Sequence, residues 1–494
     1  MSLWIKSHKE LTVLFFIILV ASFLRIYDLG TESIWLDEAH SYLVSGLPLK
    51  SIIPTTVVTD QSPLYFIILH YWTRIFGSTE AALRSMSAVF GILSVLVIYK
   101  VGCALYGKRI GLTSSLLSAI SLFHIHYSQE ARPYSLLLFF SLLSFLFFIR
   151  ILYGEPKPSR QYFYYLISNI FICCTHVFGV LIVISQMCFL LLFWKKYKQL
   201  RMKLLLLHMT TFLSFFPMML IKRSVVTTMV YEGFWIREPT LGTLYQTIYM
   251  FCGDHLLLVI VFFLLSFTAP FLINRMKGLW TIKRPLESLA ETSWRIQVDD
   301  VEKYILLVLW LFAPIIILFT ISKVYIPLYT HRYLIGASPA LIIVVAKGLD
   351  QITSNKLKYC VLIAILLLSS FGVKQYYTDS NKEQWREVAA YIEDNSANSD
   401  VIVFYKDYIQ MPFDYYYTGE LQKIGVKNPT AQHIDALLEE ATDNDRLWLV
   451  LSHGGRESQL NSYMLERYGS SAVVQTKEFV EISLTLFNIS LSDV

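Results

Sequence analysis

Charged residues are scarce in this chain, and that scarcity limits the class of protein it can be. Only 16% of its 494 residues are Asp, Glu, Lys or Arg, whereas 55% are hydrophobic. Soluble domains carry about 25% charged residues, so water alone does not accommodate this composition. The low charge and the many long apolar runs indicate a polytopic α-helical membrane protein.

Cysteine is also sparse, and none lies in the polar C-terminal tail. The six cysteines form neither a disulfide framework nor a zinc-binding spacing. A cleavable leader is not indicated, because Arg25 follows the first apolar run, residues 11–24, without a small-residue cleavage site. We therefore expect an uncleaved first span. No internal repeat or low-complexity segment is present.

Charges of the two signs are unevenly distributed. From Lys374 onward the chain holds 19 of its 37 acidic residues but only 10 of its 42 basic residues. A basic apolar body followed by an acidic polar tail predicts a transmembrane domain at 1–373 and a soluble domain at 374–494. The pattern is not that of a nucleic-acid binder, so we expect membrane lipids and no nucleic acid as partners.

Apolar runs that approach the length of a bilayer span recur along the basic body. A hydrocarbon core of ~30 Å needs about 20 apolar residues per helix, which predicts about eleven spans. They lie near 11–29, 82–105, 110–124, 133–152, 162–176, 177–194, 204–221, 244–273, 304–322, 333–350 and 359–373. The run at 244–273 is long enough to be broken.

Lysine and arginine mark one face of the membrane. When the loops are taken alternately, the basic clusters fall on one side, among them Lys108 with Arg109 and the run 195–203. The positive-inside rule assigns this side, and the N-terminus, to the cytoplasm. We expect a multi-pass protein of a plasma or inner membrane whose active site faces away from the cytoplasm. The outer side then receives residues 30–80, 123–132, 222–243, 323–332 and the tail.

Both the first outer loop and the tail have predicted secondary structure. The loop at 30–80 alternates apolar and polar stretches and is expected to lie along the interface as amphipathic helices. The tail is predicted to be an α/β domain, because helical periodicity alternates with short β-branched runs. Helices are expected at 383–393, 432–441 and 457–468, and strands at 400–404, 447–451 and 479–487.

Two adjacent carboxylates, Asp37 and Glu38, follow the first span. One interpretation is that they only cap an interfacial helix, since acidic side chains stabilise a helix N-terminus. The other is that one of them is a general base, placed where an acceptor hydroxyl arrives from water and a lipid-linked donor enters from the bilayer.

The outer loop at 124–134 contains Glu130 and Arg132 beside two histidines. It is explained either as a polar turn before a helix, or as a site in which Glu130 holds a cation or a sugar hydroxyl and Arg132 meets a phosphate. The histidines alone are weak indicators of a metal. The cofactor is left open; if Mg, Mn or Zn binds, Asp37 and Glu130 are the expected ligands.

A third outer segment ends with His331 and Arg332. A cation at this boundary ordinarily reaches toward lipid headgroups. Alternatively, the planar guanidinium of Arg332 grips a donor phosphate and stabilises the charge that grows on it as a sugar departs.

Taken in order, these motifs resemble the GT-C superfamily of glycosyltransferases. The resemblance is strongest to the branch that holds dolichyl-phosphate-mannose protein mannosyltransferases, the aminoarabinose transferase of lipid A and the Rgt-type galacturonosyltransferases. It covers residues 11–349 and rests on Asp37-Glu38, Asp60-Gln61-Ser62-Pro63-Leu64-Tyr65, Ala82-Leu83-Arg84, Ser128-Gln129-Glu130-Ala131-Arg132-Pro133-Tyr134, Thr175-His176-Val177-Phe178-Gly179 and His331-Arg332-Tyr333-Leu334.

The resemblance implies an inverting transfer from an undecaprenyl- or dolichyl-phosphate sugar to an extracytoplasmic glycan, lipid or protein. It implies Asp37 as the catalytic base with Glu38 as its neighbour. The residues that it assigns to the donor phosphate or sugar are Arg332, Arg132, Glu130, Arg84, His331 and Asp60. The family often has two prolines after the aspartate of the first loop, where this chain has only Pro63.

Three other classes remain alternatives. A transporter or channel tends to carry charges or broken helices inside its spans, whereas the charges here cluster in the outer loops. A ligase or polymerase would use a pyrophosphate-linked oligosaccharide. A scaffold without activity would use its tail to bind other envelope proteins.

Overall fold

The chain forms two compact units in the computed structural model. The first unit comprises Met1–Tyr27, Leu47–Gly77 and Ala82–Gln375; the second comprises Asp28–Gly46, Ser78–Ala81 and Tyr376–Val494. The structure describes residues 2–59, 61–154, 159–232, 236–268, 290–379, 382–426, 445–452 and 459–489.

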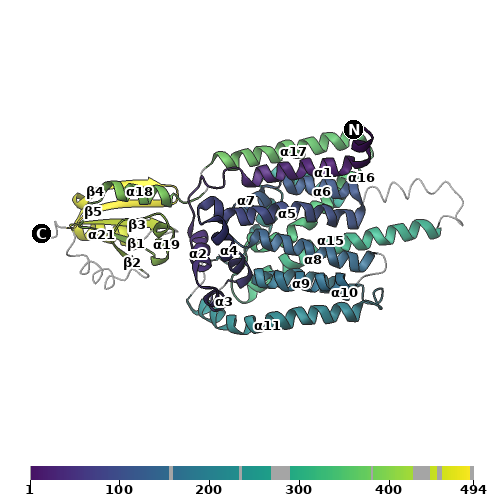
Figure 1. The fold of residues 1–494 in the computed structure, drawn as a ribbon, viewed down its shortest axis with the longest axis horizontal. Coiled ribbons are helices and arrows are strands. Elements are labelled where there is room, and N and C mark those ends of the chain that lie inside the picture. Colours follow the sequence, from purple (N-terminus) through teal and green to yellow (C-terminus); the bar gives the residue numbers. More distant parts are fainter. Residues whose placement is uncertain are drawn as a thin grey trace. The chain divides into compact units, whose positions relative to one another are not determined.

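The described part of the first unit is helical, and neighbours such as α8 and α9, or α9 and α11, run side by side (Figure 1). Two short 3₁₀ helices, Val177–Gly179 and His331–Ala337, connect longer elements. The α-helices are α1 (Ser2–Ile26), α3 (Leu49–Val57), α4 (Pro63–Phe76), α5 (Glu80–Tyr106), α6 (Lys108–Ala119), α7 (Leu122–Ser128), α8 (Tyr134–Tyr153), α9 (Arg160–Thr175), α10 (Val180–Leu192), α11 (Arg201–Glu232), α12 (Leu241–Phe251), α13 (Leu256–Phe263), α15 (Ala290–Val324), α16 (Ser338–Gln351) and α17 (Asn355–Thr378).

Several of these helices are long and apolar enough to cross a membrane. By length and composition six described segments qualify, and a seventh does if the bent pair α12 and α13 is counted as one span. The polytopic membrane class predicted from the sequence is therefore confirmed. The six are Glu80–Tyr106, Tyr134–Tyr153, Arg201–Lys222, Val301–Val324, His331–Gln351 and Asn355–Thr378.

The predicted number of spans is larger than this. Helices α6, α9 and α10 occupy predicted spans but have 12, 16 and 13 residues, fewer than the about 20 that a perpendicular helix needs. The figure of about eleven spans and the cytoplasmic N-terminus therefore stay predictions.

Aromatic packing fixes the segment that enters α16. The ring of Trp310 on α15 stacks on Phe145 of α8, with centroids 3.7 Å apart and planes 8° apart. The indole Nε1 of Trp310 donates to the Gly336 carbonyl at 2.8 Å. Because this satisfies the buried indole N–H, the 3₁₀ helix that carries His331 and Arg332 is held against the core.

The loop at 30–80 contains three short helices. These are α2 (Leu36–Gly46), α3 and α4. Pro63 is the first residue of α4, where its missing N–H costs no helical hydrogen bond. Helices were predicted here; their position along the interface stays a prediction.

The second unit contains a five-stranded mixed sheet with the order β2-β1-β3-β5-β4. Strand β1 pairs parallel with β2 and β3, whereas β5 pairs antiparallel with β3 and β4. The elements are α18 (Trp385–Asn395), β1 (Asp400–Tyr405), α19 (Gln410–Asp414), β2 (Gln422–Val426), β3 (Arg446–Ser452), α21 (Gln459–Tyr468), β4 (Val473–Phe479) and β5 (Ile482–Asn488).

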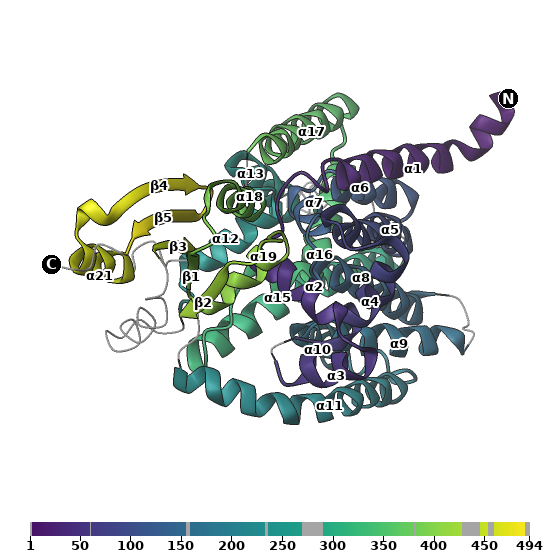
Figure 2. The same cartoon turned by 60° about the vertical axis from the view of Figure 1, so that its left-hand side comes forward.

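The sheet has a hydrophobic core on each face because alternate side chains of a strand point to opposite faces. Ile402 and Phe404 of β1 pack with α18 and α19. Val401 and Val403 pack with α21 on the other face. Figure 2 shows α18 and α19 on one side of the sheet and α21 on the other.

Most of the predicted tail elements are present. The helices predicted at 383–393 and 457–468 correspond to α18 and α21, and the three predicted strands correspond to β1, β3 and β5. The helix predicted at 432–441 lies outside the described residues. Strands β2 and β4 were not predicted.

Candidate active site

Asp37 and Glu38 lie in the first turn of α2, in the second unit. Their environments differ, because Asp37 is partly exposed whereas Glu38 is fully buried. The Nζ of Lys382, itself 8% exposed, lies 3.3 Å from Oε2 of Glu38. A buried carboxylate needs such a partner, so Glu38 is held in an ion pair and Asp37 is the more accessible acid.

The segment that leads into α2 is fastened by residues of the tail within the same unit. The Ile34 amide donates to the Tyr416 hydroxyl at 2.7 Å. The Arg386 amide donates to Ser33 Oγ at 3.2 Å, and the Arg386 guanidinium donates to the Thr31 carbonyl at 3.0 Å. These bonds fix the backbone just before the two acids.

In the first unit, Glu130 lies after α7 and is 5% exposed. Its Oε1 is 3.2 Å from Nε2 of His126, one helical turn earlier. Its Oε2 has no hydrogen-bond partner among the described residues. A buried carboxylate oxygen in this state is available to a ligand and costs stability without one.

Cations from three distant segments act on His176, the residue that caps the 3₁₀ helix Val177–Gly179. Burial, and then the nearby charges of Arg132, Arg332 and Lys222, lower the pKa of its imidazole to about 3. Arg132 Nη2 also donates to Gln61 Oε1 at 3.4 Å. The three positive charges give this part of the unit the character of an anion site.

Lys222 was not singled out in the sequence, although it is 5% exposed. Its Nζ donates to the carbonyls of Thr56, Thr59 and Gln61 at 3.1, 2.6 and 2.5 Å. It thus ties α11 to the chain between α3 and α4. The one signal in the sequence that could have identified Lys222 is its location in a predicted outer loop.

Aromatic rings orient Arg332. Its guanidinium carbon lies 5.8 Å from the centroid of Tyr134 and 5.7 Å from that of Tyr333, within the range of cation–π attraction. Tyr333 in turn stacks on Phe178 at 5.0 Å. His331 interacts electrostatically with both Arg332 and Glu130.

The structure thus brings Glu130, Arg132, His331 and Arg332 into one polar region of the first unit, while Asp37 and Glu38 belong to the second unit. Arg84 is 1% exposed within α5, and its role as a donor ligand stays a prediction. Asp60 lies outside the described residues.

His124, adjacent to this region, has a structural explanation. One ring nitrogen lies 3.1 Å from Ser118 Oγ and the other 2.8 Å from Ser338 Oγ, so the ring joins α6, α7 and α16. Among the described residues, no three His, Cys, Asp or Glu side chains are arranged to hold a metal ion. A metal at Asp37 and Glu130 stays a prediction.

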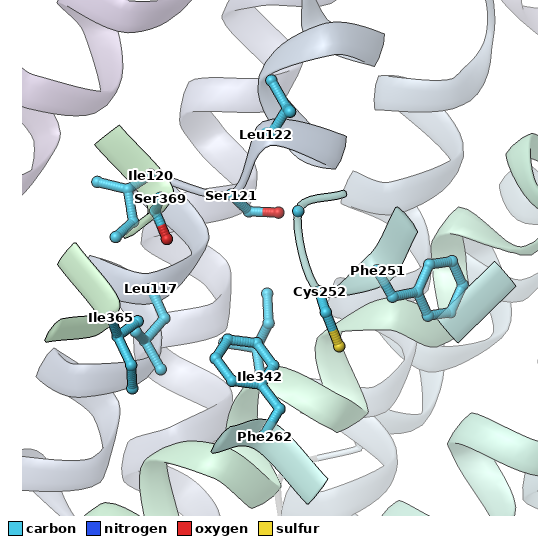
Figure 3. Close-up of a pocket in the computed structure, with 11 residues that line it drawn as sticks. Leu117, Ile120, Ser121, Leu122, Phe251, Cys252, Phe262, Ile342, Ile365 and Ser369 are labelled. Atoms are coloured by element: carbon cyan, nitrogen blue, oxygen red, sulfur yellow. The ribbon is translucent and has the colours of Figure 1, made fainter. Parts of the chain in front are cut away.

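A small apolar pocket lies beside the bend between α12 and α13. Figure 3 shows its lining residues, which come from α6, α7, α12, α13, α16, α17 and the connections beside them. The side chain of Cys252 and the ring of Phe262 face it, with Ser121 among its few polar groups. It is lined mainly by hydrocarbon.

Comparisons with known proteins agree with this architecture. The sequence model of the dolichyl-phosphate-mannose-protein mannosyltransferase family matches residues 60–221. A protein of Aquifex aeolicus (strain VF5) is 24% identical over 392 residues, which cover 72% of this chain and 68% of that protein.

Solved structures share the fold over nearly the whole chain. ArnT from Cupriavidus metallidurans, bound to undecaprenyl phosphate, is 12% identical with a TM-score of 0.59, and the match covers 99% of each chain. The apo form of the Archaeoglobus fulgidus oligosaccharyltransferase is 12% identical with a TM-score of 0.53, covering 94% of this chain and 72% of that one.

The chain has an ArnT-like fold, and its match to a mannosyltransferase family model agrees with a membrane-embedded glycosyltransferase of the GT-C class. Residues 60–221 match the sequence model of the dolichyl-phosphate-mannose-protein mannosyltransferase family. The resemblance inferred from the outer-loop motifs is thereby confirmed.

Proposed function

We propose that this enzyme transfers a sugar from a polyprenyl-phosphate carrier, with inversion, to an acceptor outside the cytoplasm. The donor class is supported by the similarity to ArnT, whose structure holds undecaprenyl phosphate. The acceptor is a glycan, lipid or protein. The basic loops on the opposite side of the membrane support an extracytoplasmic site.

The observation that carries this proposal is the position of Arg332, whose guanidinium lies over the rings of Tyr134 and Tyr333, the two rings that also lie 6.1 and 4.7 Å from the ring of His176. A monophosphate donor that approaches the membrane surface presents an anion to this guanidinium. Arg332, oriented by two aromatic rings, is the proposed ligand of the phosphate. It stabilises the charge that develops as the sugar leaves, an effect worth about 10²–10³-fold when one preorganised donor is removed.

Asp37 is proposed as the general base. Asp37 is partly exposed whereas Glu38 is fully buried, so Asp37 is the acid that an incoming hydroxyl reaches more easily. General base catalysis contributes about 10²–10⁴-fold. In this scheme Glu38 acts as the neighbour that sets the position of the first turn of α2.

Donor consumption tests the proposal. The purified protein in liposomes is incubated with undecaprenyl-phosphate sugars labelled in the sugar, and with a pyrophosphate-linked oligosaccharide in parallel. Release of label from a monophosphate carrier, in the presence of a cell-envelope extract as acceptor, is the expected result. Consumption of only the pyrophosphate donor would replace the proposal with a ligase, and movement of intact lipid without loss of label would replace it with a transporter.

A further inference from the structure

The segment that carries the proposed base forms one compact unit with the tail. Asp28–Gly46 lies between two segments of the first unit in sequence, yet it groups with Ser78–Ala81 and Tyr376–Val494. Helix α2, which presents Asp37 in its first turn, therefore belongs to the same unit as the sheet. The side chains that hold α2 in place are accordingly found in the tail.

Arg386 joins the three segments of this unit. Its guanidinium donates to the carbonyls of Gly30 and Thr31 at 3.1 and 3.0 Å and forms an ion pair with Glu80. Its backbone amide donates to Ser33 Oγ at 3.2 Å. A planar guanidinium presents several donors in a fixed fork, whereas an ammonium is a point charge. One side chain of α18 thus fixes the backbone that leads into α2.

Tyr416 completes the same network. Its ring centroid lies 5.6 Å from the guanidinium carbon of Arg386, within the range of cation–π attraction. Its hydroxyl donates to Oε1 of Glu80 at 3.0 Å and accepts the Ile34 amide at 2.7 Å. Ile34 lies just before α2, so the network reaches the point where that helix begins.

A second contact restrains α2 further along its length. The ring of Tyr42 on α2 packs edge-on against Tyr415, with centroids 5.0 Å apart and planes at 90°. The Tyr415 hydroxyl in turn donates to the Ser78 carbonyl at 2.6 Å. Two adjacent tyrosines of the tail therefore hold α2 at its start and in its middle, and with it the first turn that presents Asp37.

The Arg386 side chain lies outside the hydrophobic core of the sheet. Trp385 and Val388 of the same helix belong to that core, whereas the Arg386 side chain is 37% exposed. Replacing Arg386 therefore leaves the packing of α18 in place. A purely structural role and a role in placing the base predict different results, because only the second acts through Asp37.

We propose that the tail positions the general base: Arg386 and Tyr416 hold α2, and through it Asp37, in the orientation that an acceptor hydroxyl requires. This rests on the proposed function, in which Asp37 is the base. A base must lie within about 2.6–3.2 Å of the group whose proton it removes, and a displacement of about 1 Å can cost about 10²-fold. Because Arg332 belongs to the first unit, loss of this network lowers kcat and leaves the donor KM unchanged.

The test measures transfer from the labelled polyprenyl-phosphate donor by the full-length protein in liposomes. Arg386→Met is expected to lower kcat about 10–100-fold, with the donor KM unchanged. Arg386→Lys retains a charge for Glu80 but loses the fork, and should recover part of the loss. Tyr416→Phe keeps the ring, loses both hydroxyl bonds and should lower kcat about fivefold.

A second background separates positioning from stability. In Asp37→Asn, the added Arg386→Met should lower the residual rate by less than about twofold, because a residue that acts through Asp37 then has no base to position. Tyr416→Phe is measured in both backgrounds as well, so the test does not depend on the folding of one variant. Arg467→Met is the matched control and should leave kcat unchanged, since exposed Arg467 also lies over a tyrosine ring, that of Tyr468 at 6.0 Å.

Three results would overturn the inference about the tail. They are a wild-type kcat in Arg386→Met and Tyr416→Phe, a loss confined to the donor KM, or the same fractional loss with and without Asp37. Absence of transfer by the wild type, or full transfer by Asp37→Asn alone, is a different result, which refutes the proposed function on which the inference rests.

Discussion

Replacing Lys382 with methionine removes the partner of a fully buried carboxylate. The Lys382 Nζ lies 3.3 Å from Glu38, and the two side chains are 8% and 0% exposed. Solvent therefore screens the pair very little. Methionine has nearly the length of lysine and fills much of the same volume, so the change removes mainly the charge.

The cost follows from this burial. Breaking a buried ion pair by removing one partner destabilises a protein by about 3–5 kcal/mol, because the other charge stays buried without compensation. A cost of about 1 kcal/mol lowers the melting temperature of a domain of this size by about 2–4 °C. We therefore expect Lys382→Met to lower the first unfolding transition by about 10 °C.

Thermal unfolding in detergent measures this effect. Lys374→Met, at an exposed lysine on α17, is the matched control and should leave the transition within about 2 °C. The double variant Glu38→Gln with Lys382→Met removes both charges and is expected to recover most of the loss, since a neutral pair carries no uncompensated charge. A loss below about 1 kcal/mol in the single variant, or a double variant as unstable as the single one, would refute the reasoning.

Two further predictions concern the donor site and the sheet. Arg332→Ala should raise the KM for the polyprenyl-phosphate donor about 10–100-fold and leave the KM for the acceptor unchanged. Steady-state kinetics with each substrate varied in turn measures both values. Equal effects on the two KM values would indicate that Arg332 contacts lipid headgroups instead. Asp400→Ala should destabilise the second unit by about 2–4 kcal/mol, because the carboxylate accepts two bonds from Arg446 at 2.8 Å and one from Trp448 at 2.9 Å; unchanged protease resistance of the tail would contradict this.

The helices and strands that the sequence predicts well are those whose side chains are surrounded by lipid or protein along their whole length. Long apolar runs surrounded by lipid or protein predict helices such as α8 and α15, and short apolar runs buried on both faces predict β1 and β3. Edge strands are harder to predict, because one side of their backbone is unpaired and their side chains are largely exposed. β2 and β4 lie at the two ends of the sheet order and carry polar side chains, so their sequences resemble those of loops.

The candidate site is only partly predictable for a different reason. The motifs identify Asp37, Glu130 and Arg332 because acids and arginines are rare beside apolar runs. Pairings between distant segments leave no local pattern, as with Glu38 and Lys382, which are 344 residues apart.

Turnover by the Asp37→Asn variant tests the central claim most directly. The variant removes the basic oxygen and keeps the shape of the side chain. Asp28→Asn is the matched control, because Asp28 is exposed and asparagine also tolerates its φ of +67°. We predict that Asp37→Asn lowers transfer from the labelled polyprenyl-phosphate donor by at least about 10²-fold, with membrane insertion, thermal unfolding and donor binding unchanged. Transfer at the wild-type rate by this variant would contradict the assignment of Asp37 as the base and the mechanism built on it.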